Sequence, residues 1–120
     1  MLFRSLGAWA EAAVVRHLAA AGLEILAVNL RVGRLELDVV ARDGAVIAVV
    51  EVRTRGPGAW VRALDSVDAK KRGRVRRAGE RLWRERFAKD LTAERMRFDI
   101  AAVELLPDGE ARIELVKAAF

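Results

Sequence analysis

Residues 35–54, with the sequence LELDVVARDGAVIAVVEVRT, predict two antiparallel strands joined at Asp43-Gly44. Asp-Gly is a strong short-range signal for a hairpin, because both residues tolerate the positive φ of a turn whose twist matches the strands. Residues 45–52 are apolar except for Glu51, a pattern typical of a strand that is covered on both faces. The carboxylate of Glu51 therefore requires an explanation.

The predicted hairpin also gathers acidic side chains on one face. A two-residue loop would pair Arg42 with Ala45 and place Glu36 opposite Glu51. Because side chains alternate between faces along a strand, Asp38 would share that face and lie diagonal to Glu51, about 7 Å away. Three carboxylates would then converge in an otherwise apolar hairpin.

Carboxylates this close repel one another, and burial increases the cost, so the hairpin needs a compensating positive charge. Arg53, which the same alternation places on this face, would supply it as an ordinary ion pair at the end of a strand. A divalent metal ion would supply it equally well, since carboxylate oxygens are ligands of Mg²⁺. The spacing alone leaves both interpretations open.

The overall composition restricts the class of protein. A chain of 120 residues, 53% of them hydrophobic, is sized for one domain, residues 1–120, with a substantial core. The absence of cysteine excludes disulfides and thiolate metal sites, and it fits a reducing compartment. The net charge of +5 makes nucleic acid a candidate partner.

The amino-terminal segment does not predict a signal peptide or a membrane segment. Its apolar run is interrupted by Glu11, Arg16 and His17 before it reaches the necessary length, and no other stretch reaches it either. We therefore expect a soluble, cytoplasmic protein.

Residues 5–21 predict a helix that covers the sheet, with Ser5 as the N-cap and Gly22 just past the end. Glu11 falls almost in line with the apolar stripe of this helix, which consists of Leu6, Ala10, Ala13, Val14, Leu18 and Ala21. Either Glu11 extends its carboxylate to solvent or pairs with Arg16 or Arg31, or it is a fourth acid that reaches the site of the hairpin.

Three further strands are predicted at residues 23–31, 97–105 and 111–116. Asp99 begins the second of these, and we interpret it as a structural partner of Arg97 or of another arginine. The alternative is a group that supports the ligands of the site without binding the ion. The glycines beside Pro57 predict a loop at residues 54–60. In that loop, Trp60 either anchors the segment in the core or stacks on a base.

A strongly basic helix is predicted at residues 65–89, with Asp65 or Ser66 as its cap. Over residues 70–89, only Glu80 and Glu85 oppose the cations Lys70, Lys71, Arg72, Arg74, Arg76, Arg77, Arg81, Arg84, Arg86 and Lys89. Such dense like charge strains a helix unless an anion relieves it, which favours contact with phosphates. No base-reading motif is present, so we expect recognition of backbone or shape more than of sequence.

These features resemble the PD-(D/E)XK nuclease superfamily, and within it the YraN-like family of predicted endonucleases, which is distantly similar to archaeal Holliday junction resolvases. The resemblance covers roughly residues 7–103. It consists, in order, of Glu11 with Leu18 and Gly22; Asn29 and Arg31; Glu36-Leu37-Asp38; Asp43-Gly44; Glu51-Val52-Arg53-Thr54-Arg55; Ser66-Val67 with Lys71; and Arg97-Phe98-Asp99.

The resemblance implies an α/β fold that is restriction-endonuclease-like, with a central mixed β-sheet of about five strands flanked by helices. It implies a catalytic site of Glu11, Asp38, Glu51 and Arg53, in which Asp38, Glu51 and Glu11 hold Mg²⁺ or Mn²⁺. Glu36 would support these ligands without binding the ion itself. The superfamily's lysine is Arg53 here, which is too basic to accept a proton but can orient a water or a phosphate oxygen. Leu35 and Ala10 stand where the family commonly has glycine.

The leading hypothesis is a Mg²⁺-dependent endonuclease that hydrolyses phosphodiester bonds in branched or distorted DNA, without sequence specificity. The expected DNA contacts are Arg31, Arg55, Lys70, Lys71 and Arg74, and a homodimer would suit a two-fold junction. The first alternative is a non-catalytic DNA-binding module that retains the nuclease fold, with Arg53 neutralising Glu51. The second is a protein-interaction factor whose basic helix meets an acidic partner.

Overall fold

The computed structural model describes residues 6–55 and 69–120, together with the side chains of residues 7–54 and 69–120. The predicted caps at Ser5, Asp65 and Ser66, the loop with Trp60, and the side chain of Arg55 lie outside this part of the chain. The described elements are α1 (Leu6–Ala20), β1 (Glu24–Val32), β2 (Leu35–Asp43), β3 (Val46–Arg55), α3 (Ala69–Leu82), the π-helical turn η1 (Trp83–Phe87), β4 (Arg95–Leu105) and β5 (Ala111–Val116).

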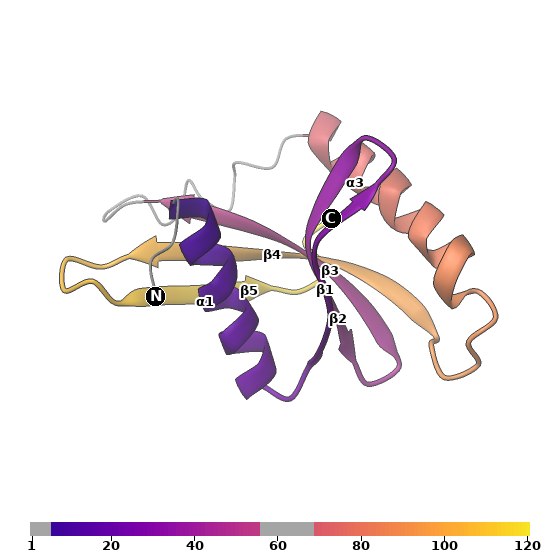
Figure 1. Ribbon diagram of the computed structural model, residues 1–120, viewed down its shortest axis with the longest axis horizontal. Helices are drawn as coiled ribbons and strands as arrows, with labels where there is room; N and C mark the ends of the chain where they lie inside the picture. Colours follow the sequence, from indigo (N-terminus) through magenta and orange to yellow (C-terminus); the bar gives the residue numbers. More distant parts are fainter. Residues whose placement is uncertain (1–5, 56–68) are drawn as a thin grey trace.

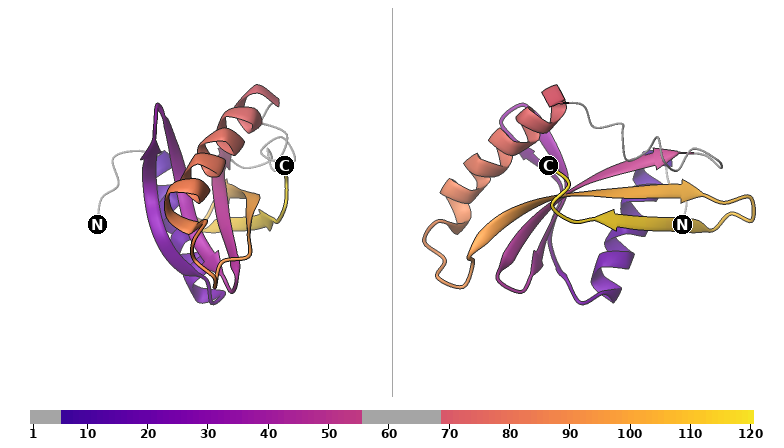
Figure 2. Two further views of the ribbon diagram at one scale, coloured as in Figure 1. Left: turned by 90° about the vertical axis from the view of Figure 1, so that its right-hand side faces the viewer. Right: turned by 180° about the vertical axis from the view of Figure 1, so that it is seen from behind.

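The five strands form one mixed sheet in the order β1-β2-β3-β4-β5 (Figure 1). Only the central pair β3–β4 is parallel, and the crossover between these two strands contains α3. The helices α1 and α3 cover opposite faces: α1 lies in front of the strands in Figure 1 and behind them in the rear view of Figure 2. The α/β prediction with a five-stranded mixed sheet is therefore confirmed.

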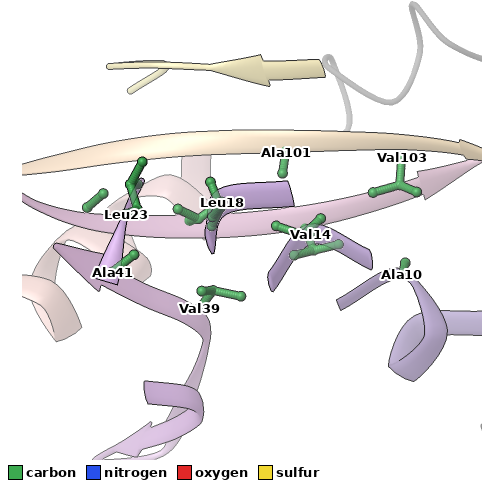
Figure 3. Packing of buried hydrophobic residues seen from close by; sticks show 11 residues of the cluster. Ala10, Val14, Leu18, Leu23, Val39, Ala41, Ala101 and Val103 are labelled. Atoms are coloured by element: carbon green, nitrogen blue, oxygen red, sulfur yellow. The ribbon is translucent and has the colours of Figure 1, made fainter. Parts of the chain in front are cut away.

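One face of the sheet is covered by α1. Ala10, Val14 and Leu18 recur every four residues, so they form one stripe, and each is fully buried. Figure 3 shows this stripe facing the β-strand side chains of Val39 and Val103. The helix ends as predicted before Gly22, whose φ of +93° is the left-handed conformation that terminates helices.

The other face packs against α3. Val75, Ala78 and Leu82 are buried there against a cluster that includes Val49 and Phe98. Gly79 allows the close approach, because a Cβ at this position would lie 2.6 Å from the ring of Phe98. The basic helix is thus fixed to the sheet by a narrow apolar stripe, and its cations lie around that stripe.

The predicted register of the β2–β3 hairpin is wrong, because each residue of β2 pairs two residues further along β3 than predicted. Asp43 pairs with Val46, so Gly44 and Ala45 form the two-residue loop in place of Asp43 and Gly44. Gly44 has a φ of +61° and occupies the first turn position, which a type II′ turn reserves for glycine. Both Asp-Gly and Gly-X are hairpin loops, so the turn signal alone does not choose between the two registers.

Candidate active site

Asp38 and Glu51 lie where β2 and β3 separate. The ladder between the two strands runs from the Asp43–Val46 pair to the Val39–Val50 pair, and one step further would place Asp38 opposite Glu51. At that step the Val52 amide donates to Asp38 Oδ2, at 2.8 Å, instead of to a strand carbonyl. The side chain of Asp38 therefore ends the ladder, and the register correction brings the two acids from a diagonal to an opposed position.

Glu51 is a buried carboxylate with incomplete partners. Its exposed fraction is 1%, and within the described part of the chain its Oε2 atom has no hydrogen bond. Its Oε1 atom lies 3.5 Å from Lys71 Nζ and 3.9 Å from Arg53 Nη2, both long contacts for ion pairs. The Arg53 Nε atom is likewise buried without a partner among the described residues. Two cations therefore approach Glu51, and neither saturates it.

The electrostatics of the pair favour an added positive charge. Burial raises the pKa of Glu51, and the neighbouring charge of Asp38 raises it further, against the opposing effects of Lys71 and Arg53. Burial also raises the pKa of Asp38, although the Val52 amide lowers it. Each carboxylate is thus costly to ionise next to the other, and a bound proton or cation would relieve the cost.

Glu11 lies on α1, which covers the face of the sheet opposite to α3. It is half-buried, and burial raises its pKa while a hydrogen bond with the Asn29 side chain lowers it. The charges of Asp38 and Glu36 raise the pKa of Glu11 further, so these carboxylates interact electrostatically. Within residues 6–55 and 69–120, however, no three Asp, Glu, His or Cys side chains are grouped closely enough to hold a metal ion together.

The strict alternation assumed for β2 breaks beside Asp38. Leu37 and Val40 pack in the same cluster on the α3 face, although alternation would place residues three apart on opposite faces. The break coincides with Asn29, which has a φ of +53° in the neighbouring strand β1. Glu36, next to buried Leu37, is exposed. The charge of Asp38 acts on Glu51, as a shared site requires, whereas Glu36 is exposed to solvent.

The five expected DNA contacts have different surroundings. Arg31 is exposed on β1, and Lys70 and Arg74 are exposed on α3. The side chain of Arg55 lies outside the described residues. Lys71 instead approaches Glu51, a position that the sequence interpretation missed. The signal was present, because Lys71 precedes Val75 by four residues and therefore shares the face of α3 that packs on the sheet.

Asp99, predicted to be structural, is fully buried among hydrogen-bond donors. The Arg97 guanidinium donates to both of its carboxylate oxygens, with Nε to Oδ1 at 2.9 Å and Nη2 to Oδ2 at 3.0 Å. The Ala118 amide donates to Oδ1 at 2.9 Å. This arrangement fastens the segment after β5 to β4, as expected of a structural carboxylate.

The described part of the chain contains the helices α1 and α3 and the turn η1. None of its helices combines the length and the apolar character needed to cross a bilayer.

Comparison with known proteins gives a consistent result. The model of a family described as "Uncharacterised protein family UPF0102" matches residues 10–103. A UPF0102 protein of Sorangium cellulosum is 69% identical over 117 residues, covering 98% of this chain and 81% of the relative. UPF0102 proteins of Ectopseudomonas mendocina and Frankia alni are 38% and 37% identical, and the alignments cover 96% and 97% of this chain and 93% and 94% of the relatives.

Proposed function

We propose that this chain, which belongs to the UPF0102 family, is a Mg²⁺- or Mn²⁺-dependent DNA endonuclease of the PD-(D/E)XK type that acts on branched or distorted DNA. The observation that carries the proposal is the buried carboxylate of Glu51, which has an unpartnered oxygen beside Asp38 at the split between β2 and β3. Buried polar groups are nearly always satisfied, so an unsatisfied carboxylate next to a second acid indicates a ligand site.

The donor set fits a divalent ion. Mg²⁺ is commonly held by one or two carboxylates and keeps several waters, so the pair of Asp38 and Glu51 suffices without a third acid. Glu51 offers its unpartnered Oε2 atom, and Asp38 offers the oxygen that does not accept from Val52. Glu11 would hold a water at the edge of the site. The ion would supply an activated water and stabilise negative charge on the phosphate.

The cations of the site have the complementary task of holding the substrate. Arg53 is largely buried beside Glu51, and its Nε atom has no partner among the described residues, so it can donate to a phosphate oxygen. Lys71 brings a second positive charge from α3 to the same carboxylate. The exposed cations Arg31, Lys70 and Arg74 would contact the DNA backbone, Arg55 is a further proposed contact, and a homodimer would present two such sites to a junction.

The test is cleavage of a four-way DNA junction with Mg²⁺ or Mn²⁺. We expect cleavage by the wild-type chain and a loss of at least about 100-fold in Asp38→Asn and Glu51→Gln, because each removes a charged ligand. Glu36→Gln is the matched control, since it removes an exposed carboxylate nearby and should retain most activity. No cleavage by the wild type, or full activity in Asp38→Asn, would refute the proposed reaction or site.

A non-catalytic DNA-binding module is the second candidate, and the contacts of Lys71 and Arg53 with Glu51 favour it. In that case the two cations serve only to neutralise the carboxylate, and α3 binds DNA without cutting it. Salt-sensitive binding that persists with EDTA, together with no product under any divalent ion, would select this candidate.

A further inference from the structure

A concavity of about 470 Å³ lies between α3 and the turn that joins β1 to β2. Figure 1 and the rear view of Figure 2 show this turn beside the helix. The concavity is lined by Val32, Gly33, Arg34, Leu35, Arg74, Arg77, Ala78 and Arg81. We call it the arginine concavity, because arginines supply all of its charge.

None of the described residues that line the arginine concavity is acidic. Arg34 comes from the turn, and the other three arginines come from successive turns of α3. Among the described residues, Arg81 pairs with the exposed Glu85 at 2.9 Å, whereas no acid pairs with Arg34, Arg74 or Arg77. Like charges gathered without a counterion cost free energy, so the arrangement favours an anion.

The other side of α3 shows that this segregation is not a property of the whole helix. A second concavity, between α3 and β4, is lined by three arginines but also by Glu80 and Glu94. One of those arginines, Arg76, stacks on the ring of Phe98, with 4.9 Å between the guanidinium carbon and the ring centre. Charge of both signs and a stacked guanidinium need no external partner, so the unbalanced charge belongs to the arginine concavity.

The turn is held close to the helix. Gly33 has a φ of +61°, and a Cβ there would lie 3.0 Å from Arg81 Nη1. Arg34 is therefore presented toward the three guanidinium groups of α3 from the opposite wall. Guanidinium groups bind phosphate through two parallel hydrogen bonds. Arginines from the turn and from α3 would therefore contact a phosphodiester backbone from two sides.

The arginines of α3 that line the concavity follow Lys71, the residue that approaches Glu51, along the same helix. At about 1.5 Å per residue, Arg77 lies about 9 Å and Arg81 about 15 Å beyond Lys71 along the helix axis. Along the axis of a duplex a strand advances about 3.4 Å per nucleotide, so for a duplex that runs parallel to α3 these distances correspond to about three to four nucleotides. We propose that the arginine concavity is a second phosphate site, which binds the DNA strand about three to four nucleotides from the phosphate at the acid pair.

This second site rests on the proposed DNA substrate and adds a second point of contact to it. A strand held both at the acid pair and in the arginine concavity must follow a path that brings two phosphates to this spacing. Base identity plays no part, because every contact is to phosphate. The strand is therefore selected by its backbone path, which fits a structure-selective enzyme.

The first experiment measures binding of a labelled four-way junction by fluorescence anisotropy in EDTA, where no cleavage interferes. The triple variant Arg34→Gln/Arg74→Gln/Arg77→Gln is compared with the control Arg84→Gln/Arg86→Gln/Arg95→Gln, which removes the same charge from exposed sites outside the arginine concavity. We expect the triple variant to bind at least about ten-fold more weakly, with a log K against log salt slope smaller by about 2–3. Equal losses in the two variants would overturn the proposal.

The second experiment locates the phosphates. Single neutral methylphosphonate linkages are moved along each strand of the junction, and affinity is measured for the wild type and the triple variant. We expect two groups of sensitive linkages about three to four nucleotides apart, of which the more distant group loses its effect in the triple variant. Sensitivity at that group that is equal in both proteins would refute the second site.

The two proposals fail separately. A chain that shows this binding pattern but never cuts DNA would refute the endonuclease and retain the phosphate site. A chain that cuts DNA while the triple and control variants bind alike would refute the phosphate site and retain the endonuclease. Thermal unfolding of all variants should match the wild type, because the substituted side chains on α3 are exposed.

Discussion

Two buried carboxylates on adjacent strands have opposite surroundings. Asp99 on β4 is fully buried and accepts hydrogen bonds from Arg97 and from the Ala118 amide. Glu51 on β3 is 1% exposed, yet its nearest cation is 3.5 Å away and one of its oxygens has no partner among the described residues. The register pairs Val50 with Asp99, so the two acids are one residue apart in the parallel ladder.

The difference shows that this sheet is able to satisfy a buried carboxylate. At Asp99 a guanidinium and an amide saturate the acid, and the result is a structural fastening. At Glu51 two cations are nearby, but they stop short of hydrogen-bonding distance, and a second acid lies beside it. Incomplete pairing at a position where the same fold achieves complete pairing points to a ligand site.

The largest expected effect on folding comes from breaking the satisfied cluster. Asp99→Ala leaves the Arg97 guanidinium buried, with Asp43 as its remaining acidic partner at 3.1 Å. Removing one member of a buried pair costs about 3–5 kcal/mol, so we expect a loss of about 3 kcal/mol in the free energy of unfolding. Urea denaturation measures it. If Glu51→Gln is destabilised by as much, the contrast between the two acids is wrong.

A divalent ion should stabilise the chain through the unsatisfied pair. Mg²⁺ or Mn²⁺ at a hundred times its dissociation constant would add about 2.7 kcal/mol to the free energy of unfolding at pH 7.5, if it binds only the folded state. The ion-dependent rise in melting temperature should disappear in Asp38→Asn and in Glu51→Gln and persist in Asp99→Ala. A rise that survives in both of the first two variants would place the ion elsewhere.

Without a metal ion, Glu51→Gln should stabilise the chain at neutral pH. Because burial raises the pKa of Glu51 above 4.5, its contribution to stability is complete below pH 4.5 and is lost as the pH rises through the pKa of the folded state. Glutamine cannot ionise, so the variant should gain on the order of 1 kcal/mol in the free energy of unfolding at pH 7. Urea denaturation in EDTA at pH 4.5 and 7.5 tests the sign, and Glu36→Gln is the exposed control. Destabilisation at pH 7.5 would contradict it.

The sequence predicts the elements of this fold because their signals are local. Alternation and the apolar run define β2 and β3, and the stripe of Ala10, Val14 and Leu18 defines α1. The hairpin register could not be predicted, because two adjacent turn signals compete and tertiary packing decides between them. The observed partners lie two residues from the predicted ones, an even shift that preserves side-chain faces, so continuing the ladder aligns Asp38 with Glu51 instead of placing it diagonally.

The site was less predictable where it depends on the path of the backbone. Asn29 adopts a positive φ, and the alternation of β2 breaks beside it, which no pattern in residues 35–54 reveals. Glu36 consequently turns outward, although its spacing from Asp38 predicted a shared face. Lys71 was assigned to the DNA surface because the charge density of α3 hid its alignment with Val75. Only the packing of α3 on the sheet brings its ammonium to Glu51.

The smallest expected effect tests that missed contact. Lys71 lowers the pKa of Glu51, so Lys71→Met should raise this pKa further and make the ionised carboxylate costlier in the folded state. We expect a loss of less than about 1 kcal/mol at pH 7.5, since the Lys71 side chain is 36% exposed and solvent screens the pair. The loss should vanish at pH 4.5 or below, and in a Glu51→Gln background. Lys70→Met, its exposed neighbour, should show no such dependence, and equal effects of the two lysines at both pH values would mean that Lys71 does not act on Glu51.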